Sequence, residues 1–309
     1  ILIFGSDLPG ISKEKVDSIA SKIRHTIGFS TDQQRHNDFD QLHDVPKSTT
    51  DLVTLVRGFV RAPLLRGLNA PQRAARKARV IAIGSAGSYT GCTMLSMNLA
   101  MELSILEKST LLIEGNYRAP SIAAYLAMRN INSDSEWKSI APHLSLAEID
   151  QEHASTVDEF MDRAAEVFEF IIIDLGSISG LSNRLIDRRW TSTMTTWCCD
   201  QADELMIVSR ADQLGGHRLS QVADLLQHTS VRASLSFVLN MKSPGKRGES
   251  EEAKFLSSTT ALKPIRVRSI SKDSRAIVAA EDEDATLVEI NVRSSVRKSI
   301  ADLARELKS

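Results

Sequence analysis

Short apolar runs alternate with stretches of helical spacing from about residue 79 to the end of the chain. The runs have the length of β-strands, and the stretches between them repeat their apolar residues about every 3.6 positions. Such alternation predicts βαβ units and a doubly wound, mostly parallel α/β sheet with helices on both faces. Ligands of such sheets bind beyond the carboxyl ends of the strands. The expected strands are 80–83, 110–113, 170–174, 204–208, 235–239 and 265–270.

The first 62 residues have a looser pattern and are interpreted as a separate, short α/β segment. The chain begins at Ile1 without an initiator methionine, which leaves open a segment upstream. The elements expected here are a strand at 1–4, a helix over 11–27, a polar loop at 30–44 and a helix over 52–60.

Residues 63–78 are interpreted as a linker between this segment and a main domain at 79–309. Prolines, a glycine and several basic residues occur there without one acidic residue. A basic run suggests nucleic acid or acidic lipid as a partner. No aromatic residue interleaves with the charges, so we expect a solvated linker and no nucleic-acid binding.

Composition adds little to this picture. Apolar residues make up 42% and charged residues 25% of the chain, and the net charge is −1. That mixture is typical of a soluble globular protein and gives no reason to expect DNA or an anionic membrane. Three cysteines are too few and too irregular for a disulfide framework, which fits a reducing, cytoplasmic location. No apolar run approaches the roughly 18 residues of a membrane span.

A loop of small residues follows the first strand of the main domain. Residues 79–84 predict the strand, 85–93 the loop, and 94–103 a helix. A strand, a small-residue loop and a helix N-terminus together form an anion site, because free backbone N–H groups point at the ligand. The loop is poor in glycine, so by itself it is a weak signal.

With its flanks, this loop resembles the deviant Walker loop of the MinD/ParA family of P-loop ATPases. The family pattern is lysine-Gly-Gly-x-Gly-lysine-Thr, followed by a helix ending in Asn-Leu-Ala. Gly87 stands in the place of the signature lysine and Cys92 in the place of the Walker lysine, while Ser88 and Tyr89 replace two glycines. The matching residues are Gly91, Thr93, Leu95, Asn98, Leu99 and Ala100.

Two further segments resemble the family's metal-supporting motifs. Residues 110–121 are similar to its Leu-Leu-Ile-Asp-x-Asp strand, which implies that Glu114 supports Mg²⁺ through water. Asn116 takes the place of an aspartate that helps to orient the attacking water, and an amide cannot supply that carboxylate. Residues 170–176 resemble a Walker B strand, with Asp174 near the metal.

Two later segments resemble the part of the family that contacts the base. The resemblance implies that Asn240, after a strand, reads the base and that Asp273 lies in the Ile-Pro-x-Asp-x-x-Ala segment. It therefore implies an ATP and Mg²⁺ site. Its nucleotide-binding residues are Gly87, Ser88, Gly91, Cys92, Thr93, Asn240 and Asp273, and its metal-binding residues are Thr93, Glu114 and Asp174.

The tail of the chain is most similar to the pilus-assembly members known as CpaE or TadZ. Those proteins carry a receiver-like domain in front, and residues 1–62 are compatible with a truncated one. An unrelated packing segment is the alternative. The resemblance implies a localisation or assembly factor for a Tad-type pilus or secretion system. Its partners would be a second copy across the nucleotide face and a pilus or secretion ATPase.

The two missing lysines bear on activity. A hydrogen bond from a cation to phosphate contributes about 1.5–3 kcal/mol. Losing two removes about 3–6 kcal/mol, on the order of 10²–10⁴ in affinity. The loss is larger in the transition state, so we expect weak or no ATP hydrolysis. Weak nucleotide binding and a vestigial loop that binds nothing both stay open.

Two other classes of protein share part of this pattern. An active ATPase for DNA partitioning or septum-site positioning would be expected to retain the lysines. A tyrosine kinase of polysaccharide export is suggested by residues 118–121, but those kinases carry a C-terminal tyrosine cluster, and the last tyrosine here is Tyr125.

Cys92 is interpreted as a small residue that fills the place of the lysine rather than as a redox group. Cys198 and Cys199 are expected in the core.

Residues 292–309 predict an amphipathic C-terminal helix with basic residues around a narrow aliphatic face. MinD uses such a helix on membranes, and peripheral membrane contact is one interpretation. Packing onto the domain is the preferred one. The apolar face comprises Val292, Val296, Ile300, Leu303 and Leu307.

Overall fold

The chain forms two compact units, Ile1–Ala70 and Pro71–Ser309. The expected helix at 52–60 and the linker at 63–78, apart from Ala78, lie outside the described residues. The computed structural model describes residues 2–5, 9, 11–20, 26–31, 42–45, 78–128, 131, 136–181, 185, 189–227, 229 and 231–308.

The first unit contains a parallel sheet of order β1-β2-β3 in its described part. Two expectations here are wrong. Ile27, expected at the end of a helix, lies fully buried in β2, and residues 42–44 of the expected loop form β3. Gly28 explains the first error, because a Cβ there would lie 2.5 Å from Leu42 and 2.6 Å from Phe4, so only glycine fits between the strands. The elements are β1 (Leu2–Gly5), α1 (Lys13–Ala20), β2 (Thr26–Ser30) and β3 (Leu42–Asp44).

The second unit is built on one sheet of order β11-β10-β9-β4-β8-β5-β7-β6 in the described residues. Each pair of neighbouring strands is parallel except β6 and β7, so the predicted doubly wound fold is confirmed. β6 and β7 were not predicted. The strands are β4 (Arg79–Ser85), β5 (Thr110–Glu114), β6 (Lys138–Ala141), β7 (Leu144–Glu148), β8 (Phe170–Ser177), β9 (Glu204–Arg210), β10 (Ser234–Lys242) and β11 (Arg266–Ser271).

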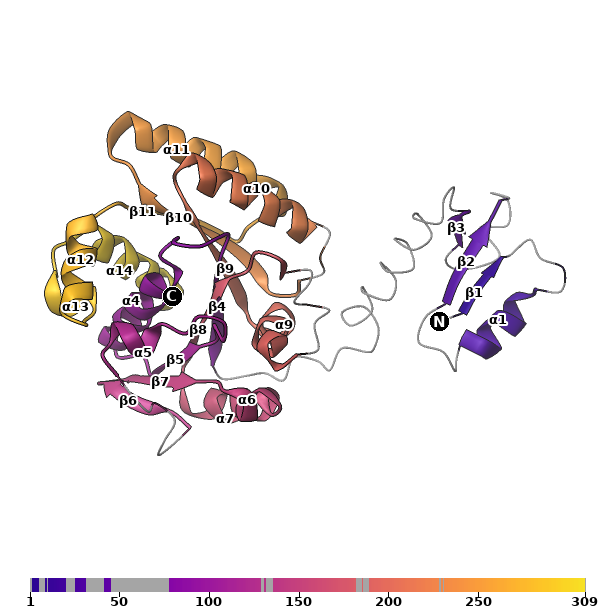
Figure 1. The fold of residues 1–309 in the computed structure, drawn as a ribbon, viewed down its shortest axis with the longest axis horizontal. Helices are drawn as coiled ribbons and strands as arrows, with labels where there is room; N and C mark the ends of the chain where they lie inside the picture. The colour runs from indigo at the N-terminus through magenta and orange to yellow at the C-terminus, as the bar shows by residue number, and fades with distance from the viewer. Residues whose placement is uncertain are drawn as a thin grey trace. The chain divides into compact units, whose positions relative to one another are not determined.

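Helices cover both faces of this sheet (Figure 1). One face packs against α7 (Val157–Val167), α9 (Thr193–Gln201), α10 (Gln213–Gln227) and α11 (Gly245–Thr259). The other packs against α4 (Cys92–Ile105), α5 (Ile122–Tyr125), α12 (Ser274–Asp282), α13 (Leu287–Ile290) and α14 (Ser295–Lys308). The short α6 (Gln151–Ala154) precedes α7.

The central strand β4 shows why the sheet needs both layers. Val80 and Ala82 face the first layer of helices, whereas Ile81 and Ile83 face the second, and all four are fully buried. A strand buried on both faces has a continuous apolar sequence instead of an alternating one. β4 lies between β8 and β9, where the strand order reverses, and this is the position at which such sheets bind ligands.

Helix α4 follows β4 and is buried along most of its length. Its one buried amide, Asn98, is fully used: Nδ2 donates to the Met94 carbonyl at 2.8 Å, and Oδ1 accepts from the Leu287 N–H at 2.8 Å. Asn98 therefore ties α4 to the start of α13. Near the other end, Glu102 accepts from Arg297 of α14 at 2.7 Å. These polar contacts fix the helix that begins at the phosphate loop.

The C-terminal helix packs onto the domain, as preferred from its narrow apolar face. Val296, Ile300, Leu303 and Leu307 are buried in the core layer that contains α4, while Val292 precedes the helix and is 58% exposed. Membrane contact through this apolar face is therefore not available in the folded domain. Among the described helices, none combines the length and apolar character needed to cross a bilayer.

A buried ionic network joins β4, β9, β11 and α14. Glu204 is 1% exposed and pairs with Arg79 at 3.3 Å and with Arg266. Arg266 also pairs with Glu306 of α14 at 2.7 Å. Glu204 thus compensates an arginine whose side chain is only 9% exposed. Removing one partner of such a pair leaves an uncompensated buried charge.

We expect Glu204→Ala to lower the free energy of unfolding of the second unit by about 1.5–3 kcal/mol, because Arg266 loses its buried partner and keeps only the partly exposed Glu306. Urea titration followed by tryptophan fluorescence measures this, since all three tryptophans lie in that unit. Asp302→Ala, which breaks an exposed pair with Arg305, is the matched control and should change stability by about 1 kcal/mol or less. Equal effects of the two substitutions would contradict a buried network.

Candidate nucleotide-binding site

The loop between β4 and α4 turns sharply and leaves the first turn of α4 uncapped. Gly91 precedes the helix with φ +79, and no side chain caps the helix N-terminus. A Cβ at Gly91 would lie 2.5 Å from Nδ2 of Asn240, so both the backbone angle and the space require glycine. The uncapped N–H groups and the positive end of the helix dipole favour an anion at this position.

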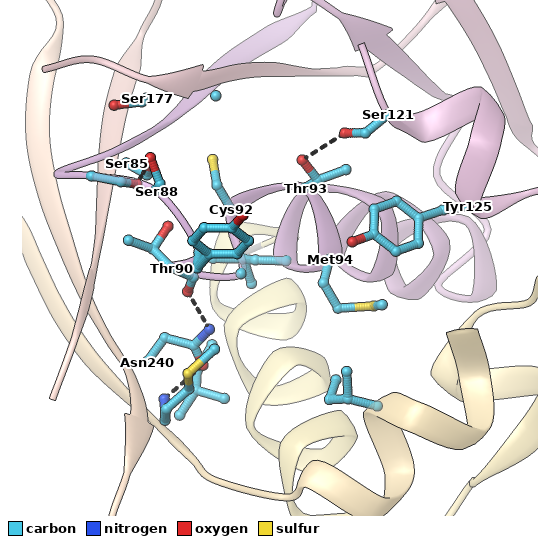
Figure 2. Close-up of a pocket in the computed structure, with 18 of the residues that line it drawn as sticks. Ser85, Ser88, Thr90, Cys92, Thr93, Met94, Ser121, Tyr125, Ser177 and Asn240 are labelled. Carbon is cyan, nitrogen blue, oxygen red and sulfur yellow. Dashed lines mark hydrogen bonds between the residues drawn. The ribbon is translucent and has the colours of Figure 1, made fainter. Parts of the chain in front are cut away.

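A pocket of about 790 Å³ opens beside this loop. Figure 2 shows Cys92, Thr93 and Met94 on the first turn of α4, with Tyr125 and Asn240 on elements around it. Seven of the predicted site residues line this pocket together, although they come from three separate parts of the chain. They are Gly87, Ser88, Gly91, Cys92, Thr93, Asn240 and Asp273.

Cys92 occupies the start of α4 with its sulfur turned inward. Sγ donates to Oδ1 of Asp174 at 3.2 Å and lies 3.4 Å from the Ile83 carbonyl. Burial, and after it the neighbouring charge of Asp174, raises the pKa of this thiol well above its usual value. The thiol is therefore neutral at physiological pH. A neutral group stands where the resemblance places a lysine.

Asp174 lies within β8, three residues before its end, and is fully buried. Its Oδ1 accepts from the Gly176 N–H at 3.0 Å, whereas Oδ2 has no hydrogen-bond partner in the described residues. Burial raises the pKa of this carboxyl, and the nearby Thr93 hydroxyl, together with the hydrogen bonds from Gly176 and Cys92, opposes the rise. An unpaired buried carboxylate oxygen beside a threonine hydroxyl suits a hard cation such as Mg²⁺. The residues present therefore fit the metal that the resemblance implies.

Glu114 accepts three backbone hydrogen bonds from the segment that follows β5. The donors are the N–H groups of Asn116 at 3.1 Å, Ser121 at 2.7 Å and Ile122 at 2.9 Å. Burial and the charge of Asp174 raise the pKa of Glu114 to about 7 in spite of these donors. Both carboxylate oxygens are engaged, so Glu114 positions the segment that carries Ser121. The water-mediated contact of Glu114 with a metal stays a prediction.

Asn116 lines the same pocket, and its amide is held within its own turn. Nδ2 donates to the Ala119 carbonyl at 2.9 Å, within the same turn. Gly176 lies directly against it, since a Cβ at Gly176 would be 2.4 Å from Nδ2. Thr93 faces this segment through a contact of 3.3 Å between its hydroxyl and that of Ser121 (Figure 2).

Asn240 and Asp273 both line the pocket while holding backbone groups. Asn240 donates from Nδ2 to the Thr90 carbonyl at 2.7 Å and accepts from the Met241 N–H at 2.9 Å (Figure 2). Asp273 caps α12 by accepting from the Ala276 N–H at 3.2 Å. Base reading by these two side chains stays a prediction. Their observed role is to fix the phosphate loop and the start of α12.

Two exposed cations, Arg118 and Lys272, also line the pocket and were not predicted as site residues. Arg118 lies in the motif after β5, and Lys272 directly precedes Asp273, so position alone could have indicated both. Within the described ranges, no cluster of three histidine, cysteine, aspartate or glutamate side chains is arranged to hold a metal ion. A bound Mg²⁺ would therefore need oxygen atoms from a nucleotide and from water.

Comparison with known proteins places the fold. No protein-family model matches the sequence. No curated protein matches it either. Solved structures do match the domain that carries the pocket, at low sequence identity.

A ParA family ATPase from Chlorobium tepidum is 20% identical, with a TM-score of 0.53, over 74% of this chain and 98% of its own. MinD in the MinC:MinD cell division complex of Aquifex aeolicus is 19% identical, with a TM-score of 0.56, over 75% and 96%. The septum site-determining protein MinD from Pyrococcus horikoshii, solved with Mg-ADP, is 17% identical, with a TM-score of 0.53, over 75% and 96%. The second unit therefore has the fold of the ParA and MinD ATPases.

Proposed function

We propose that this chain binds a nucleotide on the loop between β4 and α4 and hydrolyses ATP slowly or not at all. The contact between Cys92 and Asp174 carries the proposal. The loop between β4 and α4 has the turn of a phosphate loop, but a buried, neutral thiol stands in the place of the Walker lysine. Backbone N–H groups alone still bind phosphate, with less energy than a cation provides.

Binding is supported by what the pocket keeps. The helix N-terminus is uncapped, and the pocket is large enough for a nucleotide. A MinD with this fold was solved with Mg-ADP. Thr93 and Asp174 would hold Mg²⁺ here, and Glu114 would support it through water. The metal would neutralise phosphate charge when bound.

Weak or absent hydrolysis is supported by what the pocket lacks. Phosphoryl transfer depends on positioned positive charge and on an oriented water. Gly87 and Cys92 stand where the family pattern has two lysines, and the amide of Asn116 donates to the Ala119 carbonyl. No carboxylate is therefore available at position 116 to orient water.

We further propose that the protein is a localisation or assembly factor of a Tad-type pilus or secretion system. It would dimerise across the nucleotide face and bind the ATPase of that machine. The similarity of the tail to CpaE and TadZ supports this role. Tyr89 supports the dimer, because this aromatic side chain is 87% exposed at the tip of the phosphate loop, with φ 57. Exposed aromatic residues beside a pocket are typical of interfaces.

Purified protein is expected to show no ATP turnover above background, and Cys92→Lys alone should not restore it. The substitution returns one cation, but Gly87 and Asn116 still leave the transition state without its other stabilising groups. Phosphate release measured with and without Mg²⁺ checks this. Turnover comparable to that of a MinD enzyme would instead favour an active ATPase of the partitioning or septum-positioning type.

The Mg²⁺-dependent part of nucleotide affinity is expected to rise about tenfold between pH 6 and pH 8. The pKa of Glu114 is about 7, so the carboxyl is mostly neutral at pH 6 and mostly ionised at pH 8. Titrations of a fluorescent ADP with Mg²⁺, corrected by the same titrations in EDTA, isolate this part. Glu114→Gln should flatten the profile. A slope that survives this substitution would assign the titration to another group.

The dimer is expected to depend on Tyr89. Tyr89→Glu should convert a nucleotide-bound dimer to a monomer, because it places a charge in the centre of the proposed apolar contact. Sedimentation velocity over a range of protein concentrations measures this. Val167→Glu is the control, since Val167 is 55% exposed on α7, away from the loop. Dimers that resist Tyr89→Glu would show that the nucleotide face is not the interface.

A further inference from the structure

An arginine from another part of the chain lies against Gly87. The side chain of Arg218, on α10, is so close that a Cβ added to Gly87 would lie 2.5 Å from its Cδ and 2.8 Å from Nη1. Even an alanine at position 87 would therefore overlap Arg218. The φ angle of Gly87 lies outside the left-handed region, so the local need for glycine here is space.

Arg218 has no hydrogen bond or ion pair with any other residue in the part of the chain that the structure describes, although it is half-buried. Its neighbour Arg210 lines the same small hollow and is neutralised by Asp212. A partly buried cation without an anion loses hydration without compensation. This charge therefore has unused capacity to bind an anion.

The anion cannot lie in the hollow around Arg218. That space holds only about 10 Å³, which is no more than a single water needs. The large pocket lies on the other side of the loop, and Gly87, Ser88 and Thr90 line both spaces. Thr90 is 4% exposed, and its Oγ1 has no hydrogen-bond partner in the described residues. A buried hydroxyl without a partner is a second group that a phosphate oxygen would satisfy.

We propose that Arg218 is the cation of the phosphate site and binds the terminal phosphate of a nucleotide held on this loop. It occupies the space that a side chain at position 87 would take, and the glycine there lets it reach the phosphate across the loop. This inference rests on the proposed nucleotide binding. Positive charge is thus supplied from α10 instead of from the loop itself.

The test measures the binding of a fluorescent ATP, with Mg²⁺ present, to the full chain and to its variants at low and at high salt. Arg218→Gln should weaken binding about 10- to 100-fold, the range expected for one charged hydrogen bond to phosphate. Arg218→Lys should keep most of the affinity. Arg210→Gln is the matched control, because that cation is already paired with Asp212, and it should change affinity less than about threefold.

A double-substitution cycle tests the contact with Gly87 itself. Gly87→Ala should weaken binding by displacing Arg218, and it should have no further effect once Arg218→Ala is present, since alanine has no Cδ to meet the added Cβ. Gly87→Lys combined with Arg218→Ala should restore affinity, because the cation returns from the other side of the contact. Thermal unfolding of each variant shows that the fold is retained.

The outcomes separate this inference from the proposed function. If the unmodified chain binds nucleotide and Arg218→Gln binds it equally well, Arg218 is not the cation, while nucleotide binding stands. Additive effects of Gly87→Ala and Arg218→Ala would also overturn the inference. If the unmodified chain binds no nucleotide at millimolar concentration, the proposed function fails, and the role of Arg218 fails with it.

Discussion

The thiol of Cys92 holds together the three elements on which the pocket depends. Its sulfur contacts the Ile83 carbonyl of β4 and the Asp174 carboxylate of β8, while its backbone begins α4. The turn between strand and helix is thereby fixed without a positive charge at its centre. The buried carboxylate of Asp174 is stabilised by hydrogen bonds instead, including the one from the Gly176 N–H. The loop thus has the turn of a phosphate loop without the positive charge of a lysine.

In the rest of the described site, too, the backbone geometry of a phosphate site is present while cationic side chains are missing from its centre. Backbone groups are held firmly, by Glu114 in the segment after β5, by Asn240 at the phosphate loop and by Asp273 at α12. The two lysines of the family pattern are absent, and the amide of Asn116 is hydrogen-bonded within its own turn. Cations surround the pocket instead of lining its floor, with Arg118 and Lys272 at its exposed edge. The proposed function, nucleotide binding with little or no hydrolysis, depends on this arrangement.

The strands that the sequence predicts correctly are those whose two faces are both buried. β4, β5 and β8 have continuous apolar runs because helices cover both of their faces, so their positions could be predicted. β6 and β7 were missed because an edge hairpin is short and partly exposed, and its pattern resembles a loop. Arg218 could not be predicted, since only the folded sheet brings α10 beside Gly87. The hydrogen bond of Asn240 to Thr90 escaped for the same reason.

The strands at the two edges of the larger described sheet carry basic side chains. Lys138 lies on β6, and Arg268, whose side chain is 52% exposed, lies on β11. An edge strand offers unpaired backbone groups to other chains, and charged side chains at the edge oppose that pairing. Association that extends the sheet from one molecule to the next is disfavoured at both ends. Contacts between copies of this domain are therefore left to its helix-covered faces and loops.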